Sequence, residues 1–229
     1  GFDLGGSQSG SEEGLAKEIM QSWSFIERFV LENDLAPMLN AAESWNEETD
    51  QIVFNKNAYD YRTKSWVPDV TPPTSWELFE SFSGILSVED DRTNGLTRVT
   101  IEYFSPKIAK AWLDLYVSSI NVYMQQRRIK IISKQIEYLE VQISATLISE
   151  MREVFFDLIS EQIKAKMMAE ASPDFVFVAV SPSMIPEKKS QPKRALICVI
   201  GTLIGGISAV LLVLMLHYSG INSADNRFS

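Results

Sequence analysis

The sequence has very little of the two residue types on which much enzyme and metal chemistry depends. It contains one histidine, His217, and one cysteine, Cys198. His217 closes a long apolar run, where a ring at a membrane interface is expected rather than a general base. We therefore expect no Cys/His zinc cluster, Ser-His-Asp triad or Cys-His pair. A single cysteine also excludes a disulfide within the chain.

Two further absences argue against catalysis. The sequence has no G-x-x-x-x-G-K-S/T phosphate loop, and residues 1–10 contain no lysine. The adjacent carboxylates Glu12-Glu13, Glu47-Glu48 and Asp90-Asp91 are expected to be solvated surface rather than the acid pair of a glycosidase. We expect a protein that is not an enzyme and has no cofactor or metal.

Positive charge is scarce over most of the chain. Residues 1–186 carry 16 Lys and Arg against 28 Asp and Glu, a net charge of about −12. Phosphate binding requires a basic surface, so nucleic acid is excluded as an expected partner.

What the sequence does have is an uncharged run of 22 residues at 195–216. As a helix it is about 33 Å long, enough to cross a bilayer. We predict a transmembrane helix at 195–218, followed by a short tail at 219–229. Gly201, Gly205 and Gly206 place small residues one turn apart, which favours close packing by another helix, although glycine is common in membrane helices generally.

A proline-rich basic connector, residues 182–194, precedes this run. The prolines restrict it to stiff, extended geometry that either transmits position to the membrane or simply spaces it. The cations are expected to contact lipid headgroups, with a polymerase or an anionic lipid carrier as the alternative. The candidate contact residues of the connector are Pro182, Pro186, Lys188, Lys189, Pro192, Lys193 and Arg194.

The first hundred residues predict short elements. Residues 1–14, rich in Gly and Ser, indicate a mobile segment in which a helix opens near Ser11, and apolar spacing continues that helix to about Asn33. Prolines make 55–73 a loop, with Tyr59, Tyr61 and Trp66 expected to be exposed. A short helix begins at Trp76. Alternation after Asn94-Gly95 predicts a strand at 96–103.

Residues 106–170 predict a long helical region. Ser105 caps it and Pro106 opens it, and no proline follows until Pro173. A break between Thr146 and Ser149 favours a helical hairpin, with one unbroken helix as the alternative. Two seams at three- and four-residue spacing are expected to pack together: Ile129, Ile132, Ile136, Leu139 and Ile143, then Met151, Phe155, Leu158, Gln162 and Ala165.

Polar residues along the same region are expected to form a solvated helix face, or else to contact sugar or a neighbouring subunit. They are Gln125, Arg127, Arg128 and Lys130. The apolar run at 175–180 then predicts a buried strand. The predicted fold class is an α-dominated α/β fold: a small mixed-sheet base near the membrane, a long helix or helical hairpin, and one C-terminal transmembrane helix.

Four segments resemble the bacterial Wzz-type polysaccharide chain-length determinants, also called polysaccharide co-polymerases. They are GLTRVTIEYFSPKIAKAW at 95–112, IEYL at 136–139, AEASPDFV at 169–176 and MIPEKKSQPKRAL at 184–196. The resemblance covers essentially the whole chain, and the last segment is its most specific part. It implies an inner-membrane homo-oligomer with a periplasmic domain, here 1–181, which regulates the length of O-antigen or a related lipopolysaccharide. The implied partners are a separate O-antigen polymerase and the polysaccharide or its lipid-linked form.

The sequence departs from this family in two ways. Family members begin with a cytoplasmic N-terminus and a first membrane helix, so we expect this chain to be a fragment that also lacks the first strand of the base. Four cations precede the apolar run and only Arg227 follows it, which alone would put the acidic body in the cytoplasm. A tail-anchored coiled-coil scaffold or adaptor is therefore the first alternative. An adaptor for capsule or exopolysaccharide export is the second.

Overall fold

The structure, a computed structural model, describes residues 6–91, 93, 95–181, 183–184 and 194–225. The chain divides into two compact units, Gly1–Ile185 and Pro186–Ser229. The helices of the first unit are α1 (Gly6–Met20), α2 (Trp23–Glu32), α3 (Ala36–Asn40), α4 (Ser75–Ser83), α5 (Pro106–Ala145) and α6 (Ser149–Glu170). Its strands are β1 (Ala42–Asn46), β2 (Gln51–Phe54), β3 (Tyr59–Asp60), β4 (Ser65–Trp66), β5 (Leu86–Asp91) and β6 (Leu96–Ile101). The second unit contains α7 (Arg194–Asp225).

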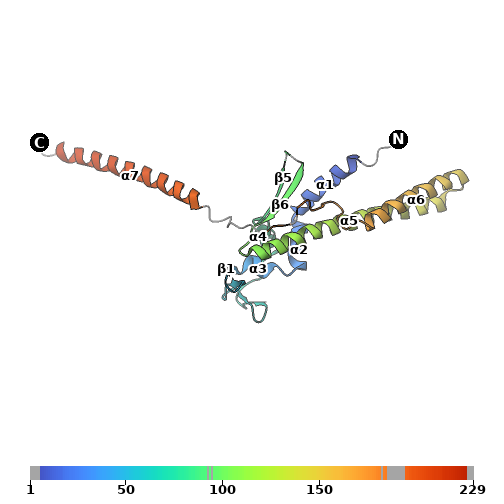
Figure 1. Ribbon diagram of the computed structural model, residues 1–229, viewed down its shortest axis with the longest axis horizontal. Coiled ribbons are helices and arrows are strands. Elements are labelled where there is room, and N and C mark those ends of the chain that lie inside the picture. Colours follow the sequence, from blue (N-terminus) through green and yellow to red (C-terminus); the bar gives the residue numbers. More distant parts are fainter. Residues whose placement is uncertain (1–5, 92, 94, 182, 185–193, 226–229) are drawn as a thin grey trace. The chain divides into compact units, whose positions relative to one another are not determined.

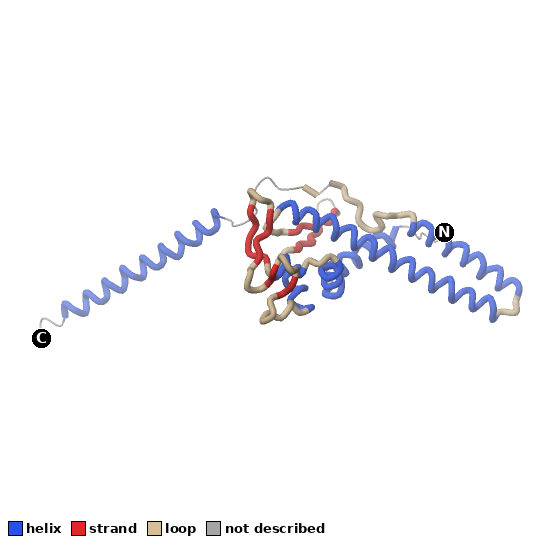
Figure 2. The backbone as a smooth tube through the Cα atoms, turned by 90° about the horizontal axis from the view of Figure 1, so that it is seen from below, coloured by secondary structure: helices blue, strands red, loops and turns tan. Residues whose placement is uncertain are grey.

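The α-dominated fold is confirmed, and its strands are simpler than a mixed sheet. Within the described residues they form three separate antiparallel pairs, β1 with β2, β3 with β4 and β5 with β6. The predicted strand at 96–103 is β6, paired with β5 from Leu86 opposite Ile101 to Asp91 opposite Leu96. Gly95 occupies the turn between them at a φ of +70°, which glycine adopts without strain. The strands gather around the first turns of α5 (Figure 2).

The predicted single helix at 11–33 is wrong, because two helices occupy this region. α1 already begins at Gly6, so the expectation of a mobile segment also fails for residues 6–14. The break follows from local capping: the Ser22 hydroxyl accepts a hydrogen bond from the Phe25 amide and so starts α2. At the end of α1, the Tyr116 hydroxyl donates to the Met20 carbonyl, one of the groups that a helix end leaves without a partner.

The core of the first unit lies where α1, α2, α4, β6 and α5 meet. Its centre is aromatic: the ring centroid of Tyr116 lies 4.7 Å from that of Phe29 and 5.2 Å from that of Phe82. Such pairs contribute about 0.5–1.5 kcal/mol each beyond the area that they bury. Burial raises the pKa of Tyr116, so its hydroxyl stays a neutral donor to Met20. This core fixes the first turns of α5 against the small elements.

The proline-rich loop at 55–73 is confirmed apart from the two-residue pair of β3 and β4. Tyr61 is exposed as predicted, but the expectation for Tyr59 is wrong, because only 8% of Tyr59 is exposed. Its ring is covered by Phe54 and by Trp66, which is itself half-buried. The loop therefore holds a small aromatic cluster of its own.

The helical hairpin is confirmed. Ser105 caps α5, Pro106 is its first residue, and the chain turns at residues 146–148 before α6 returns alongside (Figure 1). In the first seam Ile132 is fully buried, and Ile129, Ile136, Leu139 and Ile143 are half-buried. The second seam is only partly right. Phe155, Gln162 and Ala165 are half-buried, whereas Met151 and Leu158 are exposed.

The physical reason for this difference is that α6 is rotated about its own axis relative to the orientation that the predicted seam implies. Ile159 and Ala169, and not Met151 and Leu158, accompany Phe155 and Gln162 on the covered side. Phe155, Ile159 and Gln162 keep the four- and three-residue spacing of a coiled-coil seam, and Ala169 follows seven residues, or one heptad, later. Sequence spacing alone allows either choice, since the neighbours Leu158 and Ile159 are both apolar. The rotation leaves Leu158 on the surface of the hairpin.

The second unit provides the candidate membrane span. Within the described residues, the structure has one helix long and apolar enough to cross a membrane, with Cys198–Met215 as its span. None of that window is buried in protein.

Candidate functional site

Most of the predicted connector lies outside the described residues. This holds for Pro182, Pro186, Lys188, Lys189, Pro192 and Lys193. Arg194 is the first residue of α7, and its side chain is also outside. The structure does describe the chain that approaches the connector from α6. We call residues 172–184 the strap, excluding Pro182.

Asn121 holds the middle of the strap on α5. Its Nδ2 donates to the carbonyl of Phe177 at 2.8 Å. Its Oδ1 accepts from the amides of Val176 at 3.0 Å and Phe177 at 2.9 Å. Only 3% of Asn121 is exposed, so these bonds satisfy an amide that burial would otherwise penalise.

The predicted strand at 175–180 is wrong, and Asn121 gives the reason. The segment forms no ladder, and its backbone bonds with Asn121 are those that a neighbouring strand would otherwise make. Phe175, Val176 and Phe177 pack against the core, whereas Val178 and Val180 are exposed. Figure 2 shows the strap running back along the hairpin as an irregular segment.

Gln125 holds the start of the strap. Its Nε2 donates to the carbonyls of Ala169 at 2.9 Å and Ser172 at 3.0 Å. The last carbonyls of a helix have no partner within the helix, so Gln125 caps the C-terminus of α6 from the neighbouring helix. Gln125 is therefore a half-buried residue whose hydrogen bonds hold the strap, and it is not part of the predicted solvated face.

Asp114 holds the far end of the strap. Its Oδ1 accepts from the Ser183 hydroxyl at 2.5 Å, and its Oδ2 pairs with Lys110 Nζ at 2.8 Å. The bond from Lys110, then the bond from Ser183, lowers the pKa of Asp114 and keeps it ionised at neutral pH.

The three holding residues share one side of α5. Asp114, Asn121 and Gln125 are seven and four residues apart, the spacing that returns to one face of a helix. They run in the opposite direction to Ser183, Phe177 and Ser172, so the strap is antiparallel to α5. Sequence reasoning missed Asn121. The available signal was an amide inside the apolar stretch from Ile120 to Met124.

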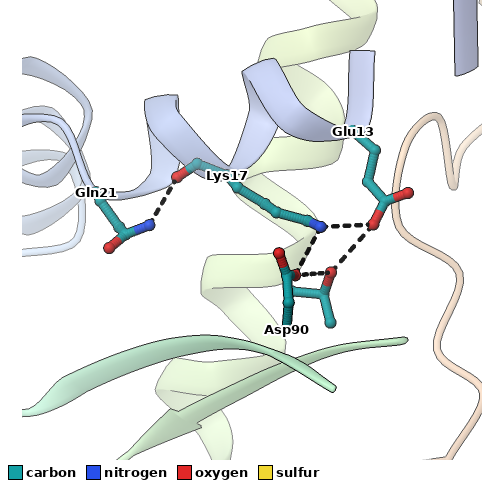
Figure 3. Close-up of polar contacts among 5 residues, drawn as sticks. Glu13, Lys17, Gln21 and Asp90 are labelled. Atoms are coloured by element: carbon teal, nitrogen blue, oxygen red, sulfur yellow. Dashed lines mark hydrogen bonds and ion pairs between the residues drawn. The ribbon is translucent and has the colours of Figure 1, made fainter. Parts of the chain in front are cut away.

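A second polar cluster joins α1 to the β5–β6 hairpin (Figure 3). Lys17 Nζ lies 2.7 Å from Asp90 Oδ1 and 2.9 Å from Glu13 Oε1. The Thr97 hydroxyl donates to the same Glu13 oxygen at 3.1 Å. The bond to Asp90, then that to Glu13, raises the pKa of Lys17, and the bond from Lys17 lowers the pKa of Glu13. The cluster fixes the β5–β6 hairpin against α1.

The predicted packing residues of the membrane helix lie in α7. Gly201, Gly205 and Gly206 are exposed, and a Cβ built on any of them would meet no heavy atom within 4 Å. A neighbouring helix therefore has room to approach at these positions, and its identity stays a prediction. The Thr202 hydroxyl donates back to the Cys198 carbonyl at 2.9 Å, so its polar group has a partner within the helix, as a membrane span requires.

Comparison with known proteins adds no assignment. A scan against models of protein families gives no match, and no curated protein shows significant similarity to the chain. Among the described residues, no group of His, Cys, Asp or Glu side chains is arranged to hold a metal ion.

Proposed function

We propose that this protein is a non-catalytic, membrane-anchored regulator of polysaccharide chain length, acting on O-antigen or a related lipopolysaccharide. It works as a homo-oligomeric co-polymerase beside a separate polymerase, in the bacterial inner membrane, with the bulk of the chain in the periplasm. The four segments that resemble the Wzz-type determinants support the family, and the apolar span Cys198–Met215 supports anchoring.

The observation that carries the proposal is the strap. A long hairpin has little mechanical connection to a membrane if a loose linker joins them. Here the chain leaving α6 is bonded to α5 by Gln125, Asn121 and Asp114, and the last of these bonds comes from Ser183, at the start of the connector. The position of the hairpin is thereby tied to the segment that leads to the membrane helix. A regulator that reports the growing polymer to a membrane-embedded polymerase needs such a tie.

Charge supports a protein partner and polysaccharide over nucleic acid. The body carries the net negative charge noted above, and the cations Lys188, Lys189, Lys193 and Arg194 are concentrated in the connector. Cations that immediately precede an apolar span favour binding to headgroups, or to the phosphate of a lipid-linked saccharide, at a membrane surface. The glycine row of α7 offers a contact for a polymerase helix.

The decisive experiment is the lipopolysaccharide ladder of the source bacterium on a gel. Deletion of the gene is expected to abolish the modal cluster of bands, and the full gene on a plasmid is expected to restore it. Restoration with Asn121→Ala is expected to broaden or shift the cluster, because the tie between hairpin and connector is cut. Gln126→Ala, an exposed neighbour on the same helix, is the matched control and should restore the native ladder.

A ladder unchanged by deletion would refute control of lipopolysaccharide length. The cations that precede α7 favour the tail-anchored scaffold. This alternative predicts that the body of the chain lies on the cytoplasmic side of the membrane. A reporter fused after β6 would then decide the topology. An export adaptor would instead alter a capsule or exopolysaccharide while leaving the ladder intact.

A further inference from the structure

The two-residue strands β3 and β4 are joined by an exposed turn at residues 61–64, which we call the tip. Asp60 fixes the shape of the tip, because its Oδ1 accepts a hydrogen bond from the Arg62 amide at 2.8 Å. Lys64 adopts the left-handed region, at a φ of 51°. Arg62 and Lys64 therefore belong to one short, ordered turn, and both are exposed.

The tip also carries an aromatic ring. Tyr61 is 66% exposed, and its ring stacks on that of Phe54, with the centroids 5.5 Å apart and the planes 16° apart. Phe54 in turn contacts the buried Tyr59, which packs on Trp66. The cluster thus supports Tyr61 from the protein side and leaves much of its ring in solvent. A side chain with an apolar ring and a polar end suits the interface between a bilayer and water.

The segment that carries the tip differs in charge from the rest of the body. Residues 55–66 contain three cations and one acid, Asp60, a net charge of +2, whereas residues 1–186 carry about −12. The three cations are Lys56, Arg62 and Lys64. All three are exposed, and none forms a salt bridge with another described residue. The acids of the β1–β2 turn are separated from Phe54 by the length of β2, about 10 Å, a distance at which salt screens most of their effect.

The tip lies at the end of the first unit from which the chain leaves for the membrane helix. Lys107 Nζ, in the first turn of α5, pairs with Asp50 Oδ2 at 2.6 Å and holds the β1–β2 hairpin there. Ser183 bonds to Asp114, about 10 Å further along the same helix. Figure 2 shows the strands at this end of the unit and the turn of the helical hairpin at the other.

The connector limits how far this end can move from the membrane helix. Arg194 begins α7 eleven residues after Ser183, and an extended chain covers at most about 3.6 Å per residue, or about 40 Å in all. In the other direction, α5 continues for 31 residues beyond Asp114, about 46 Å. Of the two ends of the first unit, the end with the strands is the one that the connector tethers to α7.

We propose that the tip docks on the surface of an anionic bilayer. Arg62 and Lys64 bind lipid phosphates, and the ring of Tyr61 lies among the headgroups. An acidic saccharide presents similar charges, but the tether keeps lipid within reach of the tip at all times. Docking gives the first unit a second contact with the membrane besides α7, which restricts its rotation about the connector. The inference rests on the anchoring part of the proposed function and not on chain-length control.

Quenching by a lipid with a nitroxide on its headgroup tests the contact. The full chain with Thr63→Cys in a Cys198→Ser background is labelled with bimane. It is reconstituted in phosphatidylcholine alone or mixed with phosphatidylglycerol. Bimane at residue 63 is expected to be quenched strongly in the anionic bilayer and several-fold less in phosphatidylcholine or at high salt. Leu147→Cys, at a hairpin-turn residue that is 98% exposed, is the control position. Quenching no stronger at residue 63 than at residue 147 would overturn the proposal.

Variants without the two charges separate binding from mere proximity. Each cation near an anionic surface contributes about fivefold to binding. Arg62→Gln combined with Lys64→Gln is therefore expected to lower the ratio of docked to undocked tips by about twentyfold. Arg152→Gln combined with Lys164→Gln removes the same charge from exposed positions of α6 and is the matched control. Circular dichroism should show unchanged helix content in both. Equal quenching in the two double variants would contradict binding by the cations of the tip.

The remaining outcomes distinguish the ligand and the function. Oligogalacturonate is added to the chain in phosphatidylcholine as a soluble acidic saccharide. A response of the bimane at residue 63 to this saccharide, with no quenching in phosphatidylglycerol, would assign the tip to saccharide and overturn docking on lipid. A quenched tip in a protein whose deletion leaves the ladder unchanged would support docking and overturn chain-length control. A reconstituted chain that does not float with the vesicles would overturn both anchoring and docking.

Discussion

At the scale of single residues, the side chain of Asn121 makes the backbone hydrogen bonds that a neighbouring strand would otherwise make. Its amide makes three bonds to the backbone of residues that follow it by 55 and 56 positions. Each of these backbone groups would otherwise need a strand or water. The result is an irregular segment that is nevertheless fixed in place.

We predict that Asn121→Ala destabilises the first unit by about 1–3 kcal/mol, because it leaves buried backbone groups of Val176 and Phe177 without partners. Denaturant unfolding measures the loss, and hydrogen exchange should quicken at the Phe177 amide. Gln126→Ala, at an exposed position, is expected to change stability by less than about 0.5 kcal/mol. Equal effects of the two variants would contradict the bonding role of Asn121.

The Lys17 cluster predicts a pH dependence. The folded pKa of Glu13 lies below its usual value of 4.5, so its contribution to stability is present above pH 4.5 and is lost as pH falls through the folded pKa. The folded pKa of Lys17 lies above its usual value of 10.5, so its contribution is present below pH 10.5 and is lost as pH rises through the folded pKa. The cluster therefore stabilises the fold across the whole range between.

Unfolding midpoints of the native chain and of Glu13→Gln, measured from pH 2.5 to 8, provide the test. The difference between the two is expected to be constant near neutrality and to shrink below about pH 4.5. A difference that grows on acidification would show that the carboxylate of Glu13 is not the stabilising form.

At the scale of elements, the hairpin divides adjacent residues between two roles. Ile132 is 1% exposed in the seam against α6, while Ile131 is 37% exposed and lines an apolar groove between α5 and α6. A hundred degrees of helix rotation separates them. Ile132 therefore stabilises the pairing of α5 with α6, whereas Ile131 lies on the surface of the hairpin.

Substitution of these neighbours should separate the two roles. Ile132→Ala is expected to cost about 2–5 kcal/mol, since it opens a cavity in the seam. Ile131→Ala, at an exposed position, is expected to leave stability nearly unchanged. Thermal unfolding of both variants checks this, and a larger loss of stability with Ile131→Ala than with Ile132→Ala would contradict the burial of Ile132 in the seam.

At the scale of the whole molecule, α7 is the one helix among those described that is long and apolar enough to cross a membrane. We predict that the chain stays in the membrane pellet after an alkaline carbonate wash. Replacing Ile204 and Ile207 together by Arg is expected to release it, because each arginine at the centre of a span costs about 2.5–3.5 kcal/mol. The same positions changed to Val should remain in the pellet. Retention of the double arginine variant would show that another part of the protein holds the membrane.

Sequence alone predicted features whose chemistry is local. Ser105-Pro106 starts α5, the break between Thr146 and Ser149 makes the hairpin, and the uncharged run at 195–216 forms the candidate span. A helix cap or a turn residue acts on residues a few positions away, and an uncharged run is a property of one continuous segment. The order of residues along the chain therefore suffices to predict these features.

The tertiary structure alone decided features that depend on distant partners. The strap is irregular because Asn121 reaches it across more than fifty residues, and α1 ends at Met20 beside Tyr116. The rotation of α6, which partly covers Ile159 and exposes Leu158, chooses between two overlapping stripes on one helix. Burial is a property of packing against other elements, and periodicity cannot rank two apolar faces of one helix. The sequence therefore determined the hairpin and the candidate span, whose signals are local, and packing determined which faces of the helices are covered and which stay exposed.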